Sequence, residues 1–214
     1  MRGEERAERL VSRIESFSDL VIGFSLALLA LTLSIPSHIV DLITNPWWLV
    51  AYFWTFAVIC ALWFNHQRLF THYFVPEIAS ILLNFLFLAM VGLIVYFVQV
   101  FVHYHDEYEK MWSFLAYFFV FGVAFISIGT LYLHGTKRRS DQLEAKDRFD
   151  GIYHGCRALA VGIAVIVGGV VTVLLKPVDM SSVWPVAVFA AIGNVGVRVV
   201  LRSVKERLLG AIDA

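Results

Sequence analysis

The most informative residues of this chain stand directly before its first long apolar stretch. Arg13 is followed by Phe17-Ser18-Asp19, and the chain is then apolar from Leu20 to Pro36. Charged side chains at the mouth of a membrane helix are costly unless they are paired or take part in function. This motif therefore favours an ion pathway over a soluble catalyst.

Further polar side chains are expected at the same membrane depth as Asp19. His66 closes the second apolar run, and Asn84 lies near the start of the third, which begins on the same side. With Arg13, these groups could satisfy one another by charge-assisted hydrogen bonds. Asn194, late in the sixth run, could join them. Each group could instead be merely interfacial, but the shared depth favours a structural network.

The composition indicates an all-α, polytopic membrane protein. The chain is 59% hydrophobic and 16% charged, whereas soluble domains carry about 25% charged residues. Its mean hydropathy is +0.75. Six apolar runs approach or exceed the roughly 17–25 residues that a helix needs to cross a bilayer. We therefore expect one six-span domain over residues 1–214, with spans near 18–36, 47–68, 78–102, 112–134, 156–176 and 183–201.

The basic residues predict the orientation. If both termini are cytoplasmic, 15 of the 17 lysines and arginines fall inside, and only Lys110 and Lys176 fall outside. This matches the positive-inside rule. The cytoplasmic loop over residues 135–155 then holds a charged segment, which is interpreted as a solvated connector in preference to a short helix. No cleavable signal peptide is evident, and a multi-pass protein of the plasma (cell inner) membrane is expected.

The first apolar run has a patterned surface. At helical spacing, Leu20, Phe24, Leu28, Leu31 and Ile35 share one face. That face could be lipid-facing or buried, or it could line a pore with a hydrophobic constriction.

Small hydroxylated residues form a stripe next to that face. Ser18, Ser25 and Thr32 recur every seven residues. Small and hydroxylated side chains let membrane helices approach closely, so this stripe is expected to pack against other helices.

The seven histidines raise a second class of function, a membrane redox or metal-binding protein. The densest cluster, His103 to Glu107, is more typical of a solvated loop than of a metal site. Haem-binding histidines should face one another at matching depths, but most of these lie in loops or at span ends. We therefore expect no cofactor, no metal site and no enzymatic activity. A secondary transporter would need a polar site near the midplane or broken helices, which the sequence does not favour.

Arg13-x-x-x-Phe17-Ser18-Asp19 at the head of a first membrane helix resembles the signature of the transmembrane protein 175 family. These are endolysosomal potassium channels and their single-repeat bacterial relatives. The resemblance extends to Trp63-x-x-His66-x-Arg68-Leu69-Phe70 at the end of the second span and to Asn84 in the third. It covers roughly the first 90 residues.

The resemblance implies a homotetrameric potassium-permeable channel in the lipid bilayer, with the first helix lining the pore. Phe24, Leu28 and Leu31 would form the constriction. Phe24 stands where the family usually has isoleucine, and without a carbonyl filter the selectivity among monovalent cations should be modest. The inner end of the helix would be braced by the signature residues Arg13, Phe17, Ser18, Asp19, Trp63, His66 and Asn84. No nucleic-acid partner is expected.

Overall fold

The computed structural model describes residues 2–33, 47–103, 107–175 and 183–210, and every regular element in these segments is an α-helix. The all-helical fold predicted from the sequence is confirmed. The helices are α1 (Arg2–Leu31), α3 (Trp47–His72), α4 (Ile78–His103), α5 (Glu107–Arg138), α6 (Ala145–Leu175) and α7 (Val183–Gly210).

Five helices are long and apolar enough to cross a membrane, namely α1, α3, α4, α5 and α6. This supports a multi-pass membrane protein. In α7 the apolar stretch that was found is shorter, Val186–Leu201, so the sixth span stays a prediction.

Several helices extend further than the predicted spans, α1 most of all. α1 begins at Arg2 and not near residue 18, because its first turns are rich in arginine and glutamate, which favour helix. An i,i+4 ion pair joins Arg9 to Glu5 at 3.3 Å there.

The connection between α5 and α6 is shorter than the predicted loop over residues 135–155. α5 continues to Arg138 and α6 already starts at Ala145, so most of the charged connector is helical. The expectation of a connector without a helix was therefore wrong for most of this segment, although its charged residues Lys146, Asp147 and Arg148 are exposed. Ile35 and the predicted span ends at residues 36 and 176 lie outside the described residues.

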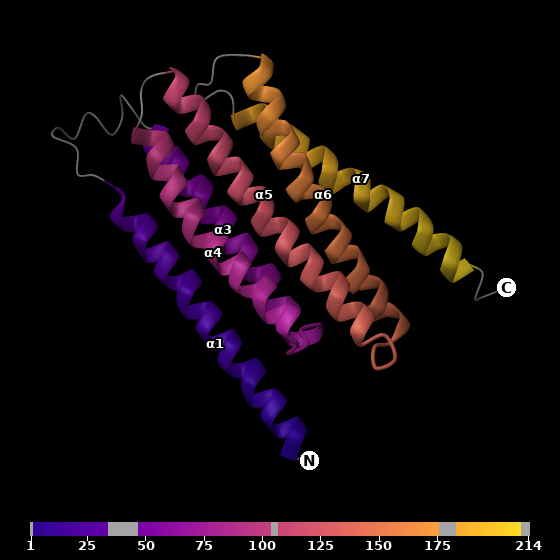
Figure 1. The fold of residues 1–214 in the computed structure, drawn as a ribbon. Coiled ribbons are helices and arrows are strands. Elements are labelled where there is room, and N and C mark those ends of the chain that lie inside the picture. Colours follow the sequence, from indigo (N-terminus) through magenta and orange to yellow (C-terminus); the bar gives the residue numbers. More distant parts are fainter. Residues whose placement is uncertain (1, 34–46, 104–106, 176–182, 211–214) are drawn as a thin grey trace.

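The helices are arranged with α1 at one side of the bundle and α7 at the other (Figure 1). α5 packs most extensively against α6 and also contacts α4, while α7 packs against α6. α1 packs against α3 and α4. The turn between α3 and α4 and the loop between α5 and α6 lie at the end of the bundle that holds the N terminus (Figure 1).

Glycines bring α5 and α6 into close contact. Gly122 and Gly129 of α5 face Gly162 and Gly155 of α6, respectively. A methyl group at Gly162 would lie 2.6 Å from the Gly122 carbonyl oxygen and 2.9 Å from Ile126 Cγ1. Small residues at such crossings let backbones approach in lipid, where helix association depends on van der Waals packing.

We expect Gly162→Ala to destabilise the protein by about 1–3 kcal/mol, because the added methyl meets backbone that cannot rotate away. Thermal unfolding in detergent measures this effect. Gly196→Ala in α7 is the matched control, since a methyl there meets nothing within 4 Å. An equal response to both substitutions would contradict close packing at this crossing.

Candidate functional site

α1 is attached to the bundle by one face. Ile14, Ser18, Ile22, Ser25 and Leu29 are all buried, at intervals of three or four residues. The serine stripe singled out in the sequence thus belongs to the packed face, at least for Ser18 and Ser25. Both hydroxyls donate to carbonyl oxygens of their own helix, which satisfies them without water.

A chain of hydrogen bonds crosses this face and joins three helices. His66 Nε2 of α3 lies 2.9 Å from Asn84 Oδ1 of α4, and Asn84 Nδ2 donates to Ser18 Oγ of α1 at 3.0 Å. Ser18 Oγ then donates to the Ile14 carbonyl oxygen at 2.7 Å. The three side chains are fully buried. Sequence reasoning placed His66 and Asn84 at one depth, and the structure brings them into direct contact and links Asn84 to Ser18.

These hydrogen bonds all run in one direction, from the His66 donor toward the Ile14 carbonyl oxygen. Because the Asn84 amide nitrogen donates to Ser18, its oxygen is the group that faces His66, so His66 must donate from Nε2. His66 is then the Nε2–H tautomer. Its Nδ1 is buried and has no hydrogen-bond partner among the described residues. A second proton on this ring would therefore be a buried donor without an acceptor, which is unfavourable.

Aromatic rings enclose His66. The Phe87 ring stacks on the imidazole with 5.3 Å between centroids and an interplanar angle of 11°, and the Phe70 centroid lies at 4.4 Å. Phe70 and Phe87 are themselves buried. The hydrogen-bond chain is therefore shielded by apolar groups, where each polar contact is stronger than it would be in water.

Asp19 makes a separate polar group with α3. Trp63 Nε1 donates to Asp19 Oδ1 at 3.0 Å, and Gln67 Nε2 donates to the same oxygen. The expected contact with Arg13 is absent: Arg13 is exposed and makes no hydrogen bond or ion pair within the described segments. The prediction of one network was therefore wrong, because Asp19 and Ser18 point to different sides of α1.

Gln67 was missed in the sequence analysis. It lies one turn after Trp63, so both side chains are on the same face of α3. That spacing could have identified it as a second donor to Asp19.

Asn194 does not join the hydrogen bonds around Ser18, His66 and Asn84. It lies on α7, which packs against α6 at the far side of the bundle from α1 (Figure 1). Its depth was compatible with the network, but depth does not specify which helices are neighbours.

Another face of α1 is apolar and exposed. Phe24 is 61% exposed, Leu28 55% and Leu31 81%. Phe17 is also exposed, although its ring makes an edge contact with Phe85 of α4. The proposed constriction residues thus lie together on one side of α1, and none of the three is buried in the protomer.

Polar contacts tie the C-terminal end of α3 to the α5–α6 hairpin. Arg68 donates to His154 of α6 at 2.9 Å, and its guanidinium also lies over the Phe64 ring. Tyr132 of α5 donates to the Asn65 carbonyl oxygen at 2.8 Å. Arg68 of the signature motif therefore anchors α3 to α6 and lies apart from His66.

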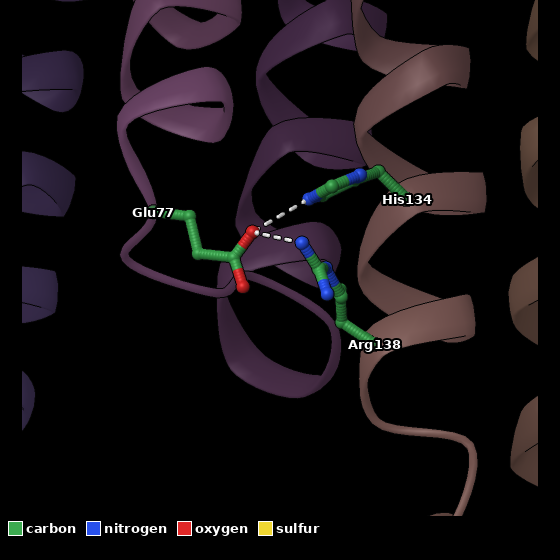
Figure 2. Close-up of polar contacts among 3 residues, drawn as sticks. All are labelled: Glu77, His134 and Arg138. Carbon is green, nitrogen blue, oxygen red and sulfur yellow. Dashed lines mark hydrogen bonds and ion pairs between the residues drawn. The ribbon is translucent and has the colours of Figure 1, made fainter.

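A second group of contacts lies at the α3–α4 turn. Glu77 Oε2 accepts from His134 Nε2 and from Arg138, each at 3.2 Å (Figure 2). These residues join the start of α4 to the end of α5. Across the described residues, no group of three or more histidine, cysteine or acidic side chains could hold a metal ion. Part of the His103–Glu107 cluster lies outside those residues.

We expect Asn84→Leu to destabilise the protein by about 1–3 kcal/mol, because it leaves the His66 Nε2–H without its acceptor inside the bundle. Thermal unfolding in detergent tests this. Asn65→Leu is the matched control, since the Asn65 amide donates only to the Ala61 carbonyl oxygen of its own helix. If both variants melt like the parent protein, the hydrogen-bond chain contributes nothing to stability.

Comparison with known proteins identifies the signature region. Residues 13–95 match the model of the endosomal/lysosomal potassium channel TMEM175 family. This segment contains every residue of the two polar groups around α1. No curated protein sequence matches the chain.

Two solved structures share the fold. A TMEM175 homologue from Chamaesiphon minutus, described as a lysosomal potassium-selective channel homologue, is 22% identical and has a TM-score of 0.67. The match covers 88% of this chain and 98% of that one. A variant of the potassium channel MtTMEM175, bound to a nanobody fusion protein, is 18% identical with a TM-score of 0.61, and the match covers 91% and 93%.

The resemblance inferred from the sequence is therefore confirmed: residues 13–95 of this chain match the TMEM175 potassium channel family, and the helical bundle has the fold of its solved homologues.

Proposed function

We propose that this protein is a potassium-permeable cation channel, assembled as a homotetramer around an axis lined by α1. The observation that carries the proposal is the division of α1 into an anchored face and an exposed apolar face within a segment that matches a potassium channel family. The solved structures with this fold are potassium channels by their own descriptions.

The position of α1 suits a pore helix. It stands at the side of the bundle and packs against α3 and α4, so its opposite side is open to neighbouring copies. Contacts at Ser18 and Asp19 hold the rotation of α1, which keeps Phe24, Leu28 and Leu31 on the open side. A lipid-facing role would expose the same residues, so the distinction requires measured flux.

The chemistry of this face predicts modest selectivity. Apolar side chains cannot replace the hydration shell of an ion, and hydrophobic constrictions control conduction by dewetting. Ions would pass largely hydrated when the constriction is open. Potassium would then be favoured over sodium less strongly than by a ring of backbone carbonyls. We place the channel in the cell membrane, with both termini cytoplasmic, and assign it no catalytic step.

Reconstituted protein should conduct potassium. We expect proteoliposomes with an outward potassium gradient to release potassium when a protonophore or counter-ion pathway balances charge, and protein-free vesicles to retain it. No flux under any gradient would overturn the proposal. A Soret band or stoichiometric transition metal in the purified protein would instead favour a redox or metal-binding function.

Phe24→Ala should raise flux and reduce the discrimination between potassium and sodium, because a smaller side chain widens and wets the constriction. Phe24 is exposed in the protomer, so the substitution should leave the melting temperature nearly unchanged. Phe53→Ala on α3 is the matched control, since Phe53 is 64% exposed on another helix. Flux is measured per folded tetramer; the pore assignment fails if Phe24→Ala and Phe53→Ala behave alike.

A further inference from the structure

A pocket of about 760 Å³ opens at the end of the bundle that holds the N terminus. Its walls come from α1, from the α3–α4 turn and from the end of α5 with the loop that follows. This volume is within the range of small-molecule sites. Ser12 is among the α1 residues that line the pocket.

Opposite charges face each other across this pocket without meeting. Glu8 and Glu15 line the α1 side, while Arg138 and Arg139 line the opposite side. Within the described segments no ion pair joins the two sides. Glu77 pairs with Arg138 and His134 on the α5 side, so its negative charge and the positive charge of Arg138 already offset each other there (Figure 2).

Arg139 is held in place and still offers charge to the pocket. Its NH1 donates to the His72 carbonyl oxygen at 2.7 Å and its Nε to Gln142 at 3.4 Å. The guanidinium keeps a further nitrogen for an anion, since it has five N–H donors. The α1 wall of the pocket therefore carries carboxylates, whereas the opposite wall carries two guanidinium groups and the Glu77 carboxylate that pairs with Arg138.

The rest of the lining is apolar and lies where the hydrophobic parts of the helices end. Phe70, Phe74, Val75 and Pro76 form this part of the wall. They stand between the end of α3 and the start of α4, both helices that are apolar enough to span a membrane. This is the level at which lipid headgroups lie in a bilayer.

We propose that this pocket binds the headgroup of an aminophospholipid such as phosphatidylethanolamine. The primary ammonium would donate to Glu8 and Glu15, and the phosphate would accept mainly from Arg139, which has no carboxylate partner among the described residues, while Arg138 is already paired with Glu77. The glycerol and upper acyl chains would lie against Val75 and Pro76, the half-buried apolar residues of the wall. A quaternary ammonium cannot donate hydrogen bonds, so phosphatidylcholine should bind less well.

A bound headgroup would connect α1 to the α5–α6 hairpin. α1 packs against α3 and α4, and the pocket separates its charged first turns from Arg138 and Arg139. The ligand would fill that separation and restrain the helix that carries the exposed apolar face. The binding claim does not depend on ion conduction and is tested without it.

The test is lipid binding to the purified full-length protein in detergent, followed by native mass spectrometry. We expect short-chain phosphatidylethanolamine to bind about tenfold more tightly than phosphatidylcholine or phosphatidylglycerol. Glycerophosphoethanolamine, which has the same headgroup without acyl chains, should bind weakly. Equal binding of ethanolamine and choline lipids, preference for the glycerol lipid, or equal binding of the soluble headgroup would each overturn the proposal.

Variants locate the lipid. Ser12→Trp fills the pocket without removing a charged group, and Arg139→Gln removes one guanidinium; both should weaken phosphatidylethanolamine binding about tenfold. Arg148→Gln is the charge-matched control on the exposed part of α6. Unchanged binding by Ser12→Trp, with the parent melting temperature and oligomer size, would place the lipid elsewhere. If Ser12→Trp instead dissociates the oligomer, a second copy of the chain occupies the pocket and the proposal is wrong.

Discussion

The attachment of α1 depends on the chain of hydrogen bonds from His66 through Asn84 to Ser18 and the Ile14 carbonyl oxygen. In lipid, apolar side chains associate no better with one another than with acyl chains, so packing shape and buried polar contacts determine how helices meet. Each of these hydrogen bonds forms well only when its donor and acceptor lie in a particular direction from each other. The contacts therefore specify the rotation of α1 as well as its neighbours.

A fixed rotation gives α1 three sides with different chemistry. The serine side is buried, the side with Glu8, Glu15 and Asp19 faces the end of α3 and the pocket, and the side with Phe24, Leu28 and Leu31 is exposed. Rotating the helix by one residue, about 100°, would bury the wrong set. A pore helix, as proposed for α1, needs a fixed rotation, because a constriction forms only if each copy presents the same side chains to the axis.

α5 and α6 supply the rigid part of the protein, and α1 is attached at its edge. The glycine crossing lets α5 and α6 lie close together along their length, while contacts from Tyr132 and Arg68 tie α3 to both. α1 reaches this scaffold through α3 and α4. A helix that is packed along one face only can change position more easily than one packed on all sides.

The sequence by itself determined the class of protein, the helical fold and the residues of the signature motif. Hydropathy and helical spacing depend on local composition, so they are readable from Leu20, Phe24 and the serine stripe alone. The pairing of polar groups was decided by tertiary structure. Arg13, Asp19 and Asn194 shared the expected depth with His66, yet Asp19 binds Trp63 and Gln67, Arg13 is exposed, and Asn194 lies on a distant helix. Depth follows from position along one helix, whereas partnership depends on the rotation and order of several helices, which are set by packing between residues far apart in the chain.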